Sequence, residues 1–154
     1  MTNDGLFIDL FAGGGGGSRA GKAARHRPVD IALNHDATAL AVHESNHPHT
    51  VHLRQDIWSV RPLEATRGRP VWGIWASPDC THHSNAKGGR PRKQEIRGLA
   101  DAVLPWMRDT RPEALFLENV PEFKGWGPLG ADGRPDKSRK GEDFERWVRE
   151  IRSL

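Results

Sequence analysis

Short apolar runs alternate along the chain with segments whose apolar residues recur at helical spacing. The runs predict buried strands at residues 6–11, 29–33, 51–53, 71–76 and 114–117. Helices are predicted at residues 18–25, 36–46 and 96–107, and residues 125–141 read as a loop rich in glycine, proline and charge. A last amphipathic helix is indicated by the apolar stripe Phe144, Trp147, Val148, Ile151 and Leu154.

The helix starts have candidate capping residues. Ser18 and Asp36 each stand where a side-chain oxygen can accept from the first free backbone N–H groups. Pro105 lies inside the helix predicted at 96–107 and can introduce a kink.

Strands that alternate with helices predict an α/β fold with a mostly parallel sheet and helices on both faces. Ligands of such sheets bind beyond the carboxyl ends of the strands. Four polar or glycine-rich stretches follow predicted strands, and we expect the site there: residues 9–21, 34–36, 77–90 and 118–119.

Composition narrows the class of protein. A length of 154 residues fits one domain, and a formal net charge of +3 permits an anionic partner without requiring one. The lone cysteine, Cys80, excludes an intramolecular disulfide and suits a reducing cytoplasm. Neither a signal peptide nor an apolar run of the roughly 20 residues needed to span a bilayer is visible, so no membrane partner is expected.

The stretch "DLFAGGGGGSRAG" begins at Asp9 and holds five consecutive glycines. A linker should separate two folded units, and the few residues before this run are too short to form one. A loop between the first strand and the following helix explains the run better, because glycine lets backbone approach a ligand closely. The pattern Asp-x-Phe-x-Gly-x-Gly differs from the dinucleotide fingerprint.

Two later strand ends carry residues suited to covalent chemistry. Cys80, in "SPDCTHHS", would stand at the mouth of the sheet, where a thiolate nucleophile can be favoured. The alternative is an inert buried thiol, although the polar neighbours of Cys80 argue against it. Glu118, in "LFLENV", follows an apolar strand; it can be partly desolvated and protonated for hydrogen bonding, or simply solvated.

A metal site is a competing interpretation of the histidines. Cys80, His82 and His83 are close in sequence, and "HESNHPHTVH" adds His43, His47, His49 and His52. Zinc sites usually show paired spacings that are missing here, so we expect surface histidines and no metal.

In this order, "DLFAGGGG", "SPDC" and "ENV" resemble the cytosine-C5 DNA methyltransferases, most closely the bacterial and phage members. The resemblance runs from about Leu6 to Val120. It implies the Rossmann-like fold of S-adenosylmethionine-dependent methyltransferases, incomplete at the C-terminus. It also implies a cofactor site formed by Asp9, Phe11, Ala12, Gly13, Gly15, Asn34, Asp56 and Ile57.

By the same resemblance, Cys80 is the nucleophile that attacks C6 of a cytosine flipped out of DNA, and Glu118 bonds the ring nitrogen N3. Pro78 and Asn119 would hold the shape of that pocket. Two positions depart from the family pattern. Asn34 stands where the family usually has a ribose-binding Glu, and Asp79 replaces the proline before the cysteine, where its charge disfavours a thiolate.

The family's catalytic domain is about twice as long and continues into a target-recognition domain. We therefore expect residues 1–154 to form a single partial catalytic domain without target recognition. The leading hypothesis is a DNA cytosine-C5 methyltransferase of a restriction-modification or phage system, with DNA and a second, target-recognising chain as partners. The alternatives are a fragment that binds S-adenosylmethionine or a partner but is inactive alone, and a tRNA cytosine methyltransferase.

Overall fold

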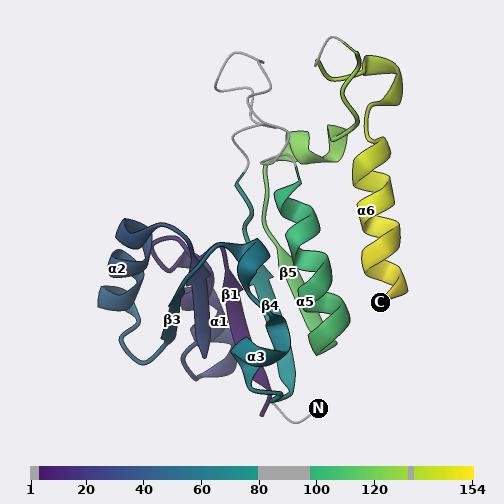
Figure 1. The fold of residues 1–154 in the computed structure, drawn as a ribbon. Helices are drawn as coiled ribbons and strands as arrows, with labels where there is room; N and C mark the ends of the chain where they lie inside the picture. Colours follow the sequence, from purple (N-terminus) through teal and green to yellow (C-terminus); the bar gives the residue numbers. More distant parts are fainter. Residues whose placement is uncertain (1–3, 80–97, 132–133) are drawn as a thin grey trace. The chain divides into compact units, whose positions relative to one another are not determined.

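The computed structural model describes residues 4–79, 98–131 and 134–154. Its centre is a five-stranded sheet in the order β3-β2-β1-β4-β5, in which every neighbouring pair is parallel (Figure 1). The strands are β1 (Leu6–Leu10), β2 (Ile31–Asn34), β3 (Val51–Arg54), β4 (Val71–Ala76) and β5 (Ala114–Leu117). The predicted parallel α/β fold is confirmed.

The chain divides into two compact units. The first unit is formed by Met1–Ser77 and Pro105–Glu118 and contains the whole sheet. The second unit is formed by Pro78–Leu104 and Asn119–Leu154.

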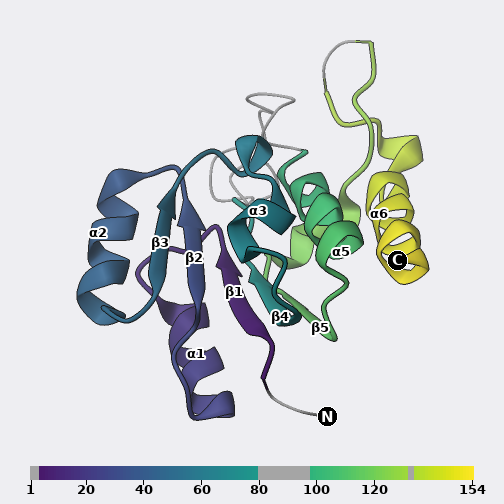
Figure 2. The same cartoon turned by 60° about the horizontal axis from the view of Figure 1, so that its bottom comes forward.

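Strand β1 lies at the middle of the sheet and all five of its residues are buried. Because side chains alternate along a strand, Phe7 and Asp9 share one face, which also carries the helix α1 (Gly16–Arg25). A Cβ atom on Gly21 of α1 would collide with the Phe7 ring, so glycine is required for the helix to lie this close to the sheet. Figure 2 shows α1 on one side of the sheet and the short helix α3 (Pro62–Thr66) on the other.

The helix starts confirm one predicted cap and correct the other. Asp36 caps α2 (Ala37–Asn46), where its carboxylate accepts from the backbone N–H groups of Thr38 and Ala39 at 2.7 and 2.9 Å. Ser18 does not cap α1, which begins two residues earlier with Gly15 at the cap position. The Ser18 hydroxyl turns inward instead and donates to a buried carboxylate.

The predicted helix at 96–107 is shorter and shifted. A 3₁₀ turn, η3 (Leu99–Ala102), leads into α5 (Val103–Thr110), and Ile96 lies outside the described residues. Pro105 falls in the first turn of α5, where its missing N–H costs no intrahelical bond, so no kink has to be invoked.

Several short elements have no counterpart in the sequence prediction. They are α3 and the 3₁₀ turns η1 (Ile57–Ser59), η4 (Pro121–Gly125) and η5 (Lys137–Arg139). Each is five residues or fewer, too short for an apolar period to show.

The second unit is organised around the predicted terminal helix, α6 (Glu142–Ser153). Trp147 is buried and its indole N–H donates to the Ala100 carbonyl at 2.9 Å. The Phe123 ring packs edge-on against Phe144 and Trp147, with centroids 5.3 and 6.0 Å away. The predicted stripe therefore forms a core, although Leu154 at its end is exposed.

Candidate functional site

The glycine run begins in the loop between β1 and α1, beyond the carboxyl end of the central strand, and its last two residues, Gly16 and Gly17, open α1. The loop is fixed to β2 by two hydrogen bonds. The Ala12 amide donates to the Leu33 carbonyl at 2.9 Å, and the Asn34 side-chain amide donates to the Ala12 carbonyl at 2.9 Å. Phe11 turns the chain here with a left-handed φ of 61°. The run is a structured loop, as predicted, and not a linker.

The glycines of this run differ in what they require. Gly15 has a φ of +101°, and a Cβ atom there would collide with the His47 ring. Gly17 lies against Trp75, whose indole nitrogen would be 2.5 Å from an added Cβ. Gly13 meets nothing within 4 Å, so its backbone is open to an approaching ligand.

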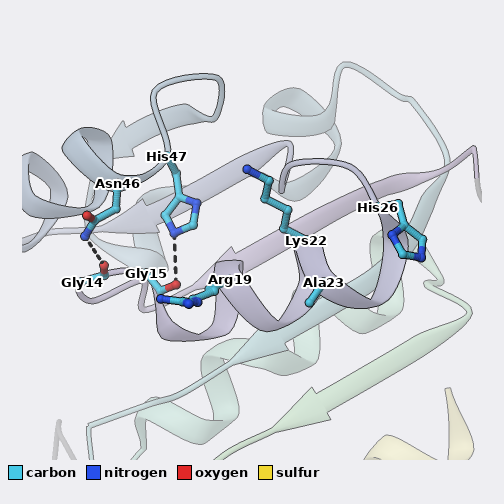
Figure 3. A pocket seen from close by; sticks show the side chains of 8 residues that line it. All are labelled: Gly14, Gly15, Arg19, Lys22, Ala23, His26, Asn46 and His47. Carbon is cyan, nitrogen blue, oxygen red and sulfur yellow. Dashed lines mark hydrogen bonds between the residues drawn. The ribbon is translucent and has the colours of Figure 1, made fainter.

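The end of α2 fixes the outer side of the loop. The Asn46 side chain donates to the Gly14 carbonyl at 2.9 Å, and His47 Nε2 bonds the Gly15 carbonyl at 3.1 Å (Figure 3). Because a carbonyl oxygen only accepts, His47 must carry its proton on Nε2.

A chain of hydrogen bonds, fully buried at its Asp9 end, runs under the loop. The Ser18 hydroxyl donates to Asp9 Oδ2 at 2.7 Å and accepts from His43 Nε2 at 2.9 Å. His43 Nδ1 lies 2.8 Å from His52 Nε2. Since the Asp9 carboxylate can only accept, Ser18 donates to it and His43 donates to Ser18 from Nε2; either ring can be the donor in the His43–His52 bond. This polar chain joins β3, α2, α1 and β1.

This polar chain corrects the expectation of surface histidines for His43, whereas His49 is exposed as expected. His43 is 0% exposed and Asp9 only 2% exposed. Burial, followed by the proximity of His43, lowers the pKa of His52 and so favours its neutral imidazole. Asp9, predicted to line the cofactor, lies beneath the loop and holds the first turn of α1 through Ser18.

The other predicted cofactor residues follow β2 and β3. The Asn34 side-chain N–H donates to the Ala12 carbonyl, and its side-chain oxygen accepts from the Asp36 backbone N–H at 2.9 Å. The amide nitrogen and the oxygen can each form one more hydrogen bond. Asp56 is exposed and accepts from the Trp58 N–H at 2.9 Å, while Ile57 beside it is buried. Trp58, which the sequence argument missed, is 55% exposed next to these residues.

Two predicted catalytic residues are joined in the second unit. The Asn119 side chain donates to the Pro78 carbonyl at 3.1 Å and accepts from the Val120 N–H at 2.8 Å. Asn119 thus fixes the backbone two residues before Cys80. Cys80 itself, with His82 and His83, lies outside the described residues.

Glu118 ends the first unit, directly after β5. Its backbone N–H extends the ladder by donating to the Ala76 carbonyl at 3.0 Å. Its side chain is exposed, so the expected partial desolvation is not found in the first unit. In the described parts of the chain, no three His, Cys, Asp or Glu side chains are arranged to hold a metal ion. No described helix is long and apolar enough to cross a membrane.

The described residues fit a nucleoside cofactor at the carboxyl ends of β1 to β3. Ribose and the edge of an adenine are bound by hydrogen-bonding groups and accessible backbone. This edge offers the open backbone of Gly13, the remaining acceptor and donor capacity of Asn34, and the exposed carboxylate of Asp56. We therefore take this edge of the first unit as the candidate cofactor site.

The model of the C-5 cytosine-specific DNA methylase family matches residues 6–126. The chain belongs to this family. The match includes all three motifs that carry the resemblance, from the glycine loop to Glu118-Asn119.

The relatives agree with this assignment. A curated relative, the type II methyltransferase M.SacI of Streptomyces achromogenes, is 28% identical over 141 residues, which cover 78% of this chain and 36% of that protein.

Solved structures show the same fold. A candidate DNA modification methyltransferase encoded within an E. coli prophage has a TM-score of 0.70 at 21% identity, over 97% of this chain and 38% of its own. DNMT2 of Spodoptera frugiperda has a TM-score of 0.61 at 16% identity, over 97% and 41%. The chain thus spans little more than a third of the length of these proteins.

Proposed function

We propose that this chain supplies the cofactor-binding and cysteine-bearing half of a DNA cytosine-C5 methyltransferase. The observation that carries the proposal is the family match over residues 6–126, together with a structured glycine loop at the carboxyl end of β1. Residues 1–154 then form one partial catalytic domain, and target recognition depends on protein outside it. The lone thiol suits the cytoplasm, where the DNA of a restriction-modification or phage system is methylated.

In this proposal the cofactor is S-adenosylmethionine, which supplies an electrophilic methyl group on a sulfonium centre. Phe11, Ala12, Gly13 and Gly15 present loop backbone to it, and Asp9 supports that loop from beneath. Asn34 offers its remaining bonding capacity to the ribose hydroxyls, and Asp56 and Ile57 bound the adenine.

The catalytic residues act on a cytosine that has left the duplex stack. The Cys80 thiolate adds to C6, while Glu118, protonated, hydrogen-bonds N3 and balances the negative charge that develops on the ring. C5 thereby becomes nucleophilic and is methylated. Loss of the C5 proton then restores the C5–C6 double bond and expels the Cys80 thiolate. Asn119 and Pro78 fix the backbone that leads into Cys80.

The direct test is transfer of a labelled methyl group from S-adenosylmethionine to duplex DNA. It is run with this chain alone and with the chain extended by whatever its gene encodes next. Transfer by either form, abolished in Cys80→Ala and reduced at least about 100-fold in Glu118→Gln, supports the proposal. Failure of every form, with the cofactor demonstrably bound, contradicts the enzymatic role.

A second candidate function is binding of S-adenosylmethionine without methyl transfer by this chain alone. It is favoured by the chain spanning only 36% and 38% of the relatives named above. Calorimetric titration with the cofactor separates the two. Binding without transfer, restored to transfer by a second chain, identifies a split enzyme. Replacing DNA by tRNA in the same assay tests the remaining substrate alternative.

A further inference from the structure

A pocket of about 710 Å³ lies between the outer face of α1 and the turn that follows α2 (Figure 3). We call it the α1 pocket. Its walls carry Arg19 and Lys22 from α1, His26 directly after it, and Asn46 and His47 from the end of α2. All of these polar side chains are neutral or basic, and none of the described residues that line the pocket is acidic.

The basic side chains form a stripe. Arg19 and Lys22 stand at positions i and i+3 of α1, so they lie on one face of the helix; His26 follows the helix as its C-cap residue, and all three are exposed. The α1 sequence contains no Asp or Glu that could neutralise them. The first-turn N–H groups of α1 have no side-chain cap and add the positive end of the helix dipole beside Gly15.

Several arginines of the described chain are neutralised by carboxylates, whereas Arg19 and Lys22 are not. Arg27, Arg61, Arg139 and Arg146 each form an ion pair with a carboxylate at 2.6 to 3.1 Å. Within the described residues, no carboxylate lies within 4.0 Å of the Arg19 or Lys22 head group. Two cations are thus exposed together in one pocket without a counter-charge, an arrangement that attracts anions.

The spacing of the stripe selects an extended anion. The stripe runs along α1 from Arg19 to His26, the residue that follows the helix, and at 1.5 Å per residue this is about 10 Å, a length that neighbouring phosphates of one strand can share. A single small anion cannot contact both ends. Proteins also contact nucleic-acid phosphates with the groups found here, namely guanidinium, ammonium, side-chain amide and helix N-terminus.

We propose that the α1 pocket holds the phosphate backbone of DNA, at a contact that positions the duplex and reads no sequence. Gly15 alone among the eight proposed cofactor residues lines this pocket, so the contact is separate from most of the cofactor site. It does not depend on methyl transfer and is measured without cofactor.

The test is fluorescence anisotropy with a short labelled duplex of arbitrary sequence, titrated at several salt concentrations. Arg19→Gln/Lys22→Gln should bind more weakly and reduce the slope of log K against log salt by about 2, since about one counterion is released for each phosphate contact. The control Arg108→Gln/Arg111→Gln removes the same charge from exposed positions at the end of α5 and should leave the slope unchanged. Circular dichroism verifies that both variants are folded.

A gain of charge gives the converse result. Ala23 lines the pocket, whereas its exposed neighbour Ala24 does not, so Ala23→Arg should raise the slope by about 1 and Ala24→Arg should not. Any of three results would overturn the proposal. The two double variants could show equal slopes, the two arginine insertions could show equal slopes, or the unaltered chain could fail to bind DNA at low salt.

Discussion

At the scale of single residues, the polar chain from His52 to Asp9 is the feature that most separates this structure from its sequence. A histidine in a polar segment resembles any surface histidine, and nothing local indicates that His43 is completely buried. Burial is decided by where α2 lies on the sheet, which a single sequence does not state. The glycine loop of the predicted cofactor site is therefore supported from beneath by buried polar residues that the glycine motif does not indicate.

Removing the Ser18 hydroxyl should destabilise the chain. In Ser18→Ala the buried Asp9 carboxylate and the His43 N–H both lose their partner, a cost of about 1–3 kcal/mol in the free energy of unfolding. Urea unfolding followed by circular dichroism measures it. Ser45→Ala is the matched control, because Ser45 is exposed and bonds only the Ala41 carbonyl of its own helix. Equal stability of Ser18→Ala and the unaltered chain would contradict the role of the polar chain.

Stability should also fall in mild acid. Burial lowers the pKa of His52, so below the ordinary histidine value of about 6.5 the folded chain binds fewer protons than the unfolded chain. The free energy of unfolding then rises with pH across that window and is lost as pH falls through it. Urea unfolding at a series of pH values tests this, and His52→Gln should show a shallower slope. A slope that His52→Gln leaves unchanged would assign the effect to other groups.

At the scale of elements, the sequence predicts those helices and strands whose formation depends on a long apolar pattern. All five strands, the Asp36 cap and the terminal helix are confirmed, because burial on a sheet imposes a periodicity that can be read directly. The start of α1 and the turn η1 depend instead on glycine and loop chemistry, where no period exists. Likewise, the order of the motifs predicts where the site lies. It does not predict the hydrogen bonds of Asn46 and His47 to the glycine loop, because these residues lie about thirty positions further along the chain.

The glycines of α1 should respond to alanine with opposite signs. Gly21→Ala places a Cβ atom against the Phe7 ring and should cost about 1–3 kcal/mol of stability, even though alanine favours helix. Gly16→Ala meets nothing within 4 Å and should be neutral or stabilise by up to about 1 kcal/mol. Thermal unfolding of both variants checks the pair. Two changes of the same sign would mean that α1 does not lie as close to β1 as described.

At the scale of the whole molecule, exposed positive charge and exposed apolar surface lie on different elements and favour different kinds of partner. The net charge of +3 is modest, but Arg19 and Lys22 of α1 line one pocket and have no carboxylate partner among the described residues, so an anion can bind there. Apolar surface gathers elsewhere in the first unit. Phe116 of β5 is 42% exposed and stacks on Trp75, with ring centroids 6.4 Å apart, and β5 is an outer strand of the described sheet.

We expect the isolated chain to self-associate through this strand. An outer strand offers unpaired backbone N–H and C=O groups, and an exposed aromatic ring adds apolar area that association removes from water. Phe116→Lys should shift the chain toward monomer in light scattering, because a lysine on an edge strand opposes strand pairing. Val42→Lys, which changes a similarly exposed position on α2, should not. A monomeric unaltered chain, or equal association in both variants, would show that β5 is not the contact.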